Sequence, residues 1–540
     1  MVSDMEEVPV LIVGGGPVGL GLAIDLGWRG VDCLLVEQSD GTIFHPRANA
    51  INSRTMEFCR RWGIADTVRD AGAPPEFPAT ILYITGLQGY ELARIERPTH
   101  GGRGPLPTTP ERPQRCNQLW FDPVLRDRAG QFDSVTLAYE TRFDSFERAE
   151  DGVIATLTDL KSGAVRRVRA RYLVSCCGGR SAVPKALGVL WEGRPVLSYN
   201  LNIFIRVDEL WRWTDKGQAA FYMLTYADGS QGALIELDGN SLWRLGVRNV
   251  DHEITAGNID VDAVVRRAIG PKVPYEVVSA LPWTCRSIVA DRWADGPVLL
   301  AGDAVHQHSP AGGFGMNTGM GDAVDLGWKL AALVEGWGGD RLLQSYPAER
   351  RPVAQRNVRV ATEANEEVYN PDLVPLIEDA TPEGKAARAA LGAEILERRS
   401  RQFISDGIAL GYCYESSPVV WPDGSPPPAE DSMRYTPTTR PGARAPHGWI
   451  AEGRSTLDLF GRGFVLLAFD GGAGEGAGLE AAAQARSVPF ETVSIGDPDL
   501  AALYERRLVL VRPDGHVAWR GDAAPDDPDA VLEVVRGATG

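Results

Sequence analysis

The N-terminal segment carries the pattern that most restricts how this chain can fold. An apolar run, Val8 to Val13, leads directly into Gly14-Gly15-Gly16-Pro17-Val18-Gly19, a GxGxxG motif. Apolar residues at helical spacing follow from Leu20 to Leu26, and a second apolar run ends in Glu37. A strand, a glycine turn, a helix and a second strand ending in an acid form a Rossmann βαβ unit. The sequence therefore predicts an α/β dinucleotide-binding domain.

Each motif position of such a unit has a physical role. Gly14 should make the tight turn, and Gly16 should let the backbone approach a pyrophosphate at the helix N-terminus. Gly19 should let the helix pack closely on the strand, and Glu37 should accept hydrogen bonds from an adenosine ribose. A purely structural βα turn is the weaker alternative, because the strand, the helix and the acid are all in place.

A second glycine-rich stretch lies near the middle of the chain. An apolar run from Val298 to Ala301 predicts a buried strand, Asp303 follows in a sharp turn, and a helix is expected to start near Met316. Gly312, Gly313 and Gly315 lie between them. Unpaired N–H groups at a helix start attract negative charge, so an electron-rich group is expected against this backbone. The alternative is an ordinary βα turn.

Composition excludes several classes of partner. The net charge of −17 argues against nucleic acid and against an anionic membrane surface. The seven cysteines show no zinc spacing and suggest reduced thiols, the N-terminus resembles no signal peptide, and no apolar run reaches the roughly 20 residues of a membrane helix. His306 and His308 lack a third ligand, so no metal is predicted. We expect a cytoplasmic protein without a membrane anchor.

The pattern changes along the chain in a way that predicts several domains. Strand-like runs with one helical interruption indicate an antiparallel sheet inserted into the dinucleotide fold, and a Pro-rich stretch indicates a linker. A small α/β domain without cysteine follows. The predicted boundaries are 1–190 and 283–417 for the dinucleotide domain, with 75–113 reaching toward the inserted sheet; 191–282 for that sheet; 418–446 for the linker; and 447–540 for the C-terminal domain.

Four motifs in this order resemble a known family. They are GGGPVG with Glu37, PRANAINSRTMEF, CGGRS and AGDAVHQHSPAGGFGMN. The chain resembles, over essentially its whole length, the class A flavoprotein aromatic hydroxylases, the group of para-hydroxybenzoate hydroxylase and phenol hydroxylase. Its end, LVLVRPDGHVAWRG, is similar to the thioredoxin-like domain of the phenol and aromatic-polyketide hydroxylases. The resemblance implies a Rossmann-like FAD-binding domain, an inserted antiparallel-sheet substrate domain and a thioredoxin-like C-terminal domain.

The resemblance also implies non-covalently bound FAD and a role for each motif residue. Gly14, Gly16, Gly19 and Glu37 would hold the ADP half. Arg47, Gln118 and Asp303 would contact the phosphates and the ribityl chain. The N–H groups of the 312–317 loop would face the pyrimidine edge of the flavin, with Gly312, Gly313, Gly315, Met316 and Asn317 as the binding residues. A homodimer is expected, as in the family.

The implied reaction has two stages. NADPH or NADH reduces the flavin, and O2 then gives a flavin hydroperoxide that hydroxylates a phenolic or hydroxylated heteroaromatic ring. Pro310 would lie beside the flavin carbon that carries the peroxide. Asn49 stands where relatives place a substrate-side Asp or His, and an amide takes no proton at neutral pH. Either Asn49 only orients the substrate, or the proton acceptor is another residue, with Tyr222 and His308 as candidates.

Two departures from the family pattern leave other functions open. Cys177 and Pro184 stand where relatives carry an Asp and an Arg, and the Asp supports reduction of the flavin by the nicotinamide. We therefore expect slow reduction. The alternatives are a Baeyer–Villiger or epoxidising monooxygenase that acts on a polycyclic polyketide, and a non-catalytic FAD-binding protein.

Overall fold

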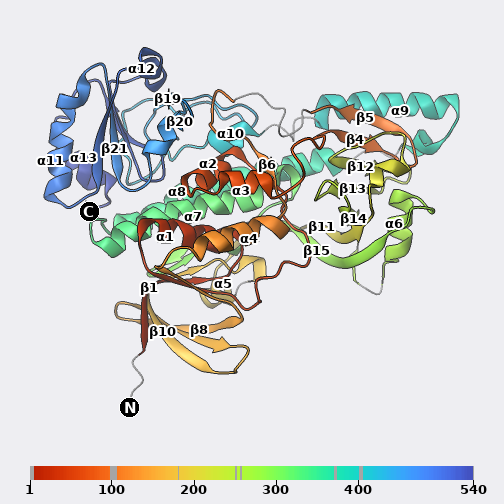
Figure 1. Ribbon diagram of the computed structural model, residues 1–540, viewed down its shortest axis with the longest axis horizontal. Coiled ribbons are helices and arrows are strands. Elements are labelled where there is room, and N and C mark those ends of the chain that lie inside the picture. The colour runs from red at the N-terminus through yellow and green to blue at the C-terminus, as the bar shows by residue number, and fades with distance from the viewer. Residues whose placement is uncertain are drawn as a thin grey trace.

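The computed structural model describes residues 5–97, 106–180, 182–249, 252–255, 258–369, 374–399 and 405–538. The molecule is elongated (Figure 1), with a small sheet domain at the C-terminal end, a layer of long helices over a parallel sheet in the middle, and a second large sheet at the other end. Part of the predicted 75–113 segment and short stretches near both ends of the chain lie outside the described residues.

The first sheet has the order β16-β17-β10-β1-β2-β7, with the β8–β9 hairpin extending from β10. Pairing from β17 to β7 is parallel, and the strands β1 and β2 are buried apolar runs, as expected where both faces of a parallel sheet are covered. Its strands are β1 Glu6–Val13, β2 Cys33–Val36, β7 Val135–Ala138, β8 Thr141–Ala149, β9 Gly152–Asp159, β10 Val165–Ser175, β16 Ala294–Asp295 and β17 Val298–Leu300.

Helices cover this sheet and connect its strands. The helix α1 packs against both α4 and α7, and α7 packs against α8 (Figure 1). The helix α7 begins at Phe314, one residue after the left-handed Gly313, and thus two residues before the predicted start near Met316. The helices and short strands of this region are α1 Pro17–Arg29, α2 Ser53–Arg61, α3 Ala65–Asp70, α4 Gln118–Ala129, α5 Ala182–Ala186, α7 Phe314–Glu335, α8 Arg341–Tyr369, α10 Asp406–Leu410, β3 Ala50–Ile51 and β6 Gln114–Arg115.

The second sheet has the order β18-β15-β11-β14-β13-β12-β4-β5 and is antiparallel except between β12 and β4. Apolar residues of α6 pack on one face, and α9 packs on the other face near β4 and β5. The elements are β4 Ile81–Ile84, β5 Glu91–Ile95, β11 Trp191–Arg206, β12 Phe221–Thr225, β13 Gln231–Glu236, β14 Leu242–Asn249, β15 Glu276–Ala290, β18 His306–Gln307, α6 Val261–Ile269 and α9 Pro382–Glu394.

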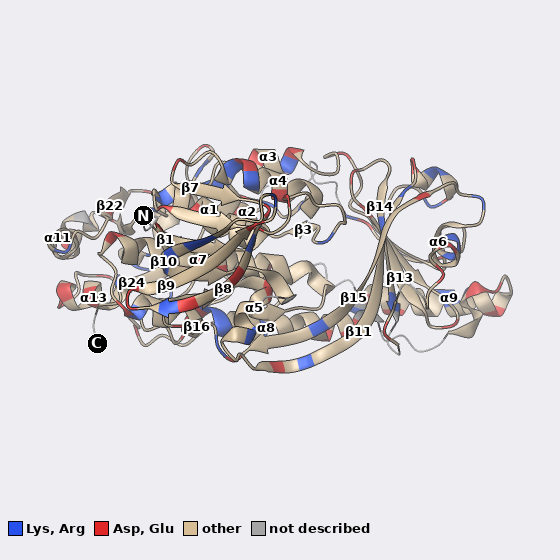
Figure 2. Ribbon diagram, turned by 90° about the horizontal axis from the view of Figure 1, so that it is seen from below, with Lys and Arg blue, Asp and Glu red and all other residues tan. Residues whose placement is uncertain are grey.

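The strands β11 and β15 are much longer than the other strands of this sheet. They have 16 and 15 residues and run antiparallel as a curved ribbon from the second sheet to the middle of the molecule (Figure 2). The sequence predicts that the second of these strands ends at Leu281, but β15 continues past Pro282 without a break. The ribbon therefore belongs both to the second sheet and to the region that faces α8.

The C-terminal domain is a four-stranded sheet in the order β22-β21-β23-β24, in which only β21 and β22 are parallel. The helices α11 and α13 pack together beside it. Phe464 of β21 contacts Trp328 of α7, with ring centroids 6.3 Å apart. The elements are β19 Trp449–Ala451, β20 Arg454–Ser455, β21 Phe464–Phe469, β22 Phe490–Ile495, β23 Leu508–Val511, β24 Val517–Gly521, α11 Ala477–Ala485, α12 Pro498–Tyr504 and α13 Pro528–Val535.

A buried ionic network joins this domain to the helices beneath it. Arg512 of the C-terminal domain pairs with Glu349 of α8 at 2.6 Å, and Glu349 pairs with Lys329 of α7, also at 2.6 Å. Asp325 and Asp514 complete the network at 2.7 and 2.6 Å from Lys329 and Arg512. All five side chains are almost fully buried. Buried charges are stable only when paired, so the two domains depend on each other here.

The segment 418–446 contains no helix or strand, yet its second half is packed tightly. Thr439, Arg444 and Ala445 are buried, and Arg444 Nε donates to Glu57 Oε2 at 3.0 Å. The predicted linker is thus fixed against α2 along these residues. None of the described helices is long and apolar enough to cross a membrane.

Candidate functional site

The first glycine turn presents bare backbone at the start of α1. Gly14 has φ of +114°, and a Cβ there would lie 2.6 Å from the carbonyl oxygen of Cys176. A Cβ at Gly19 would lie 2.0 Å from the Gly14 carbonyl oxygen, so both positions require glycine. Gly16 caps α1, and a Cβ there would enter open space. An anionic group fits at Gly16, against the helix N-terminus.

Glu37 is fixed beside this turn, directly after β2. Its Oε2 accepts from the Gly15 amide at 2.8 Å, and its Oε1 accepts from the Ser39 amide at 2.8 Å. The carboxylate is half-buried and has lone pairs left over, because each oxygen accepts only one of these bonds. It can therefore also accept hydrogen bonds from a bound hydroxyl group.

The second glycine loop supplies a left-handed turn and then a helix start. Gly312 and Gly313 have φ of +75° and +68°, and α7 follows immediately. Pro310 precedes them and is exposed, whereas Met316 is half-buried against the core. The nearest atoms to a Cβ at Gly315 would belong to His308, at 3.7 Å or more. The loop therefore offers N–H donors and the positive end of the α7 dipole to a bound group.

Asn317 fixes this loop through its side chain. The Oδ1 atom accepts from the Asn52 amide at 3.0 Å and from the Thr55 hydroxyl at 2.7 Å, and Nδ2 donates to the carbonyls of Ala50 and Gly313 at 2.9 and 2.8 Å. The sequence prediction concerned only the backbone of this loop. The side chain joins the first turn of α7 to the segment that precedes α2.

Asp303 lies after β17, at the turn between the first sheet and this loop. Solvent reaches its side chain, yet the protein packed around it raises the pKa of the carboxyl, against the lowering effect of His306 and Arg47. The exposed side chain leaves the carboxyl oxygens accessible to a bound group. Asp303 can thus accept hydrogen bonds from a polyhydroxylated chain.

The two histidines of the loop differ in environment. His306 is buried, and its Nε2 lies 2.7 Å from Asp322 Oδ2, whose other oxygen accepts from Arg350 at 2.9 Å. Burial raises the pKa of Asp322, but His306 and Arg350 together bring it below the ordinary value. His308 has two buried ring nitrogens without a partner among the described residues, and burial and then His306 lower its pKa well below the usual range. His308 is therefore neutral at pH 7.

Arg47 and Gln118 lie on neighbouring segments, because the Gln118 amide donates to the Ala48 carbonyl at 2.9 Å. Arg47 is exposed, and its carbonyl accepts from Arg244 Nη1 at 2.8 Å. Gln118 is buried, and its Nε2 donates to Asp122 Oδ2 at 2.9 Å. Burial raises the pKa of Asp122 to about 7, against the lowering effects of Gln118 and Arg47. Arg47 therefore remains available to a phosphate, and Gln118 has its carbonyl oxygen free to accept.

Asn49 and Tyr222, two residues predicted to act on the substrate, lie in different surroundings. Asn49 has a buried Nδ2 without a partner among the described residues. Tyr222 lies on β12 in the core that packs against α6, and its hydroxyl donates to the Gly217 carbonyl at 2.6 Å. Burial raises the pKa of Tyr222. Tyr222 is on the sheet face opposite to Arg244, which contacts the Arg47 loop, so the structure does not bring it to the glycine loop.

A row of polar residues lies on the face of the second sheet that carries Arg244. The strand register places Trp283, Asn200, Arg248 and Gln231 directly across from one another on four adjacent strands. Both amide atoms of Gln231 and the Trp283 indole nitrogen are buried without a partner among the described residues. Sequence reasoning missed this polar row, because only strand pairing brings residues from four distant segments together.

Two contacts show which way the polar row faces. On the same sheet face, Ser279 Oγ lies 2.7 Å from His45 Nδ1, and Arg244 binds the Arg47 carbonyl. Ser287 of β15 contacts Thr362 of α8 at 2.6 Å, one helical turn before Asn365, whose buried Nδ2 also lacks a partner among the described residues. The face is thus bordered by the 45–47 loop and by α8.

Cys177 is turned toward the first sheet. Its Sγ donates to the Val13 carbonyl at 3.1 Å, next to the first glycine turn. Pro184 is buried in α5. Among the residues that the structure describes, no group of three or more His, Cys, Asp or Glu side chains gathers in a way that could hold a metal ion.

Comparison with known proteins identifies the architecture. Residues 7–361 match the family described as "FAD binding domain", and residues 438–539 match "Aromatic-ring hydroxylase, C-terminal". The chain is 36% identical over 567 residues to tetracenomycin B2 monooxygenase-dioxygenase of Streptomyces olivaceus, and the alignment covers 98% of each protein. The chain belongs to the FAD-dependent aromatic-ring hydroxylases.

Solved structures agree over the whole chain. The rebeccamycin biosynthetic enzyme RebC with reduced flavin is 43% identical, with a TM-score of 0.92 over 99% of this chain and 100% of RebC. Aklavinone-11 hydroxylase with FAD and aklavinone is 29% identical, with a TM-score of 0.84 over 99% and 100%. The predicted family, the mixed α/β fold with an FAD-binding domain and the FAD cofactor are confirmed. This hydroxylase is a flavoprotein monooxygenase that uses NAD(P)H and O2.

Proposed function

We propose that this hydroxylase inserts one oxygen atom from O2 into an electron-rich ring of a flat, polycyclic aromatic substrate. Two relatives act on or bind molecules of this kind, tetracenomycin B2 and aklavinone, by their names. The observation that carries the proposal is the polar row of Trp283, Asn200, Arg248 and Gln231. Its buried and unpartnered indole and amide groups cost free energy unless a ligand satisfies them.

The chain's own residues would hold FAD through the two glycine loops. Gly14, Gly16, Gly19 and Glu37 would bind the ADP half, and Arg47, Gln118 and Asp303 the phosphates and ribityl chain. The 312–317 loop would donate N–H bonds to the pyrimidine edge, with Asn317 holding the loop in place. When bound, FAD supplies the hydride acceptor and the means of activating O2. The α7 dipole favours negative charge at that edge.

The residues around the substrate would orient it and move its proton. Asn49 donates or accepts hydrogen bonds but takes no proton. His308 is neutral and has partner-free ring nitrogens beside Pro310, so we assign it to accept and pass on the phenolic proton. Because its pKa is lowered, His308 is a weak base, so it would pass the proton on rather than keep it. Tyr222 supports the sheet from the other side.

The remaining parts of the proposal concern the domains, the oligomeric state and the cellular location of the protein. We infer a substrate domain built on the second sheet, a thioredoxin-like C-terminal domain and a homodimer in the cytoplasm. The strand order of the C-terminal sheet and its helices support the thioredoxin-like assignment. The net charge of −17 keeps the protein from anionic surfaces and is compatible with a cytoplasmic protein.

Turnover assays on the purified protein test this function. The expected result is a yellow protein whose NADPH or NADH oxidation accelerates with planar polycyclic phenols, and a product heavier by one oxygen with its rings intact. A ring-opened or ring-expanded product would assign Baeyer–Villiger chemistry instead. Flavin binding without substrate-dependent turnover on any planar phenol would assign a non-catalytic role. His308→Ala should slow turnover of phenols more than that of substrates that are already anionic.

A further inference from the structure

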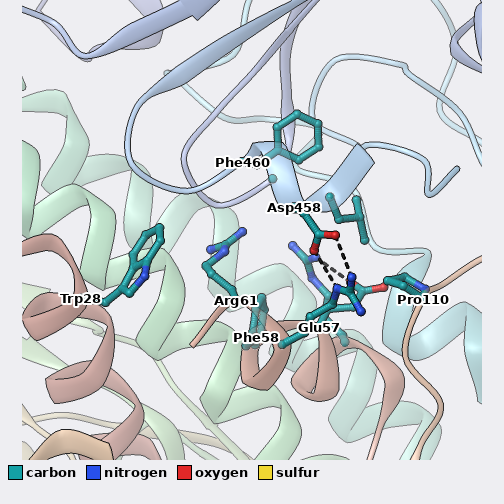
Figure 3. Close-up of a pocket in the computed structure, with 11 residues that line it drawn as sticks. Trp28, Glu57, Phe58, Arg61, Pro110, Asp458 and Phe460 are labelled. Atoms are coloured by element: carbon teal, nitrogen blue, oxygen red, sulfur yellow. Dashed lines mark hydrogen bonds and ion pairs between the residues drawn. The ribbon is translucent and has the colours of Figure 1, made fainter. Parts of the chain in front are cut away.

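A cavity of about 230 Å³ lies where the C-terminal domain meets α1 and α2 (Figure 3). Residues of α1, α2, the turn Thr456–Leu459 and the β23–β24 turn form its walls. The lining residues are Trp28, Arg54, Glu57, Phe58, Arg60, Arg61, Pro110, Leu457, Asp458, Phe460 and Gly515. We call it the Arg61 cavity.

The positive charges of this cavity are not balanced. Asp458 pairs with Arg60 at 2.7 Å, and Glu57 pairs with Arg54 at 2.9 Å. Three guanidinium groups thus face two carboxylates in the lining, and both carboxylates are already in ion pairs. One cation, Arg61, is left over.

Arg61 has no ion pair or hydrogen bond among the described residues, and its Nη1 is fully buried without a partner. The two nearest acids are engaged elsewhere, since Asp25 pairs with Arg29 at 2.9 Å and Asp514 with Arg512 at 2.6 Å. Figure 3 shows the Arg61 guanidinium between Trp28 and the Phe460 segment, apart from the ion pairs around Asp458. Arg61 is half-buried, and a guanidinium with a buried nitrogen and no counter-ion is costly, so an anion is expected beside it.

The walls limit what this anion is. Trp28, Phe58, Leu457 and Phe460 are apolar or aromatic, which favours an organic body over inorganic phosphate. A single unbalanced cation favours one negative charge. The volume lies below the roughly 300–1,000 Å³ of sites for drug-sized ligands, which excludes a polycyclic substrate.

We propose that the Arg61 cavity binds a small organic monocarboxylate, with the carboxylate on the Arg61 guanidinium and the apolar body against Trp28 and Phe460. Guanidinium and carboxylate match in a two-bond geometry. The ligand would touch α1 and α2 of the FAD-binding domain and Phe460 of the C-terminal domain at once. Binding would therefore strengthen the contact between these domains.

The FAD-loaded enzyme tests this with benzoate and 4-bromobenzoate as probes. Crystals soaked in 4-bromobenzoate should show anomalous bromine density beside Trp28. In calorimetry, benzoate should bind and neutral benzamide should not, and the flavin absorption spectrum reports separately on any binding near the flavin. Arg61→Gln should weaken benzoate binding by about tenfold or more, since a charge-assisted pair is lost.

Arg462→Gln is the matched control. Arg462 lies over the Trp28 ring at 4.5 Å but does not line the cavity, so its loss should change the affinity less than about threefold. Benzoate should raise the thermal unfolding midpoint of the wild type and of Arg462→Gln but not of Arg61→Gln. If Arg61→Gln fails to fold, Arg61→Lys replaces it, with weakened binding expected. Bromine density absent from the cavity, or affinity unchanged by either Arg61 substitution, would overturn the proposal.

Discussion

The carboxyl of Asp122 titrates, and it accepts a hydrogen bond from Gln118, a residue that we assign to flavin binding. It lies in α4, one turn after Gln118, and its pKa is raised to about 7 by burial. An acid whose pKa is higher in the folded than in the unfolded state does not change the free energy of unfolding below about pH 4. It lowers that free energy progressively as the pH rises from about 4 to 7.

Asp122→Asn should remove this pH dependence. The amide keeps an oxygen acceptor for Gln118 but cannot ionise, so the variant should gain stability relative to the wild type between pH 4 and pH 7 and keep that gain above pH 7. Urea unfolding at pH 4.5 and pH 8 measures the difference. Asp127→Asn, at an exposed position of the same helix, should change neither value. An equal effect of Asp122→Asn at both pH values would refute the assignment.

Cys177 stands where the resemblance to the family predicts a carboxylate that supports flavin reduction, and the structure adds a constraint. Its thiol donates to the Val13 carbonyl, which a carboxylate cannot do, so an Asp there must turn away from β1. We predict that reduction by NADPH limits turnover and that Cys177→Asp speeds it about tenfold, since one charge-assisted bond contributes about 1.5–3 kcal/mol.

Stopped-flow reduction with and without a planar phenol measures this step. Cys177→Ser is the control, because a hydroxyl can keep the donor to Val13 without adding charge, and it should leave the rate nearly unchanged. If Cys177→Asp slows reduction, the cysteine is an adapted replacement rather than a defect.

At the scale of elements, the two glycine loops could be predicted from the sequence, but the side-chain hydrogen bonds that hold the second loop in place could not. The motif positions of Gly312 and Gly313 follow from the need for positive φ, which glycine satisfies locally. The four bonds of the Asn317 side chain depend on where Ala50 and Thr55 fold in space, and no local pattern contains that information.

Asn317→Ala should therefore loosen the start of α7. The substitution leaves the Asn52 amide and the Ala50 carbonyl without their partner, and we expect a loss of about 3 kcal/mol in the free energy of unfolding together with weaker FAD binding. Chemical denaturation and flavin fluorescence measure the two effects. Asn52→Ala, which loses a single capping bond to Thr55, should cost only about 1 kcal/mol. Similar losses from both variants would count against this role for Asn317.

The length of β15 illustrates a second limit of sequence prediction. Pro282 suggests the end of a strand, because proline cannot donate to a neighbouring strand. In the structure Pro282 pairs with Leu201 on β11, while β18 pairs with β15 only at Ile288 and Val289. Among the described residues no strand pairs with the other edge of β15 at this proline, which only the assembled sheet reveals.

At the scale of the whole molecule, the domains are joined by charges that are distant in sequence. Arg512 and Glu349 are separated by 163 residues, so neither composition nor spacing could pair them. Arg512→Ala would leave Glu349 and Asp514 buried with one partner fewer, and we expect a loss of about 3–5 kcal/mol.

Denaturant unfolding checks this value, with Arg506→Ala as the control. Arg506 belongs to the same domain and pairs with Asp522 at the surface, so its loss should cost less than about 1 kcal/mol. Because the network spans both domains, Arg512→Ala should also separate the unfolding of the C-terminal domain into a transition of its own. A single transition at the wild-type midpoint would contradict the dependence between domains.

The ribbon of β11 and β15 makes the hydroxylase mechanically stiff along its length. At about 3.4 Å per residue, the 15 residues of β15 span about 50 Å. Hydrogen bonds pair the strands over nearly this whole distance, and the register shifts at two places on β11, between Arg194 and Ser198 and between Phe204 and Ile205. A paired two-stranded ribbon of this length resists a hinge motion between its two ends. We therefore expect a flat substrate to enter through local displacement of the parts that border the second sheet, such as α8, rather than by separation of the second sheet from the first.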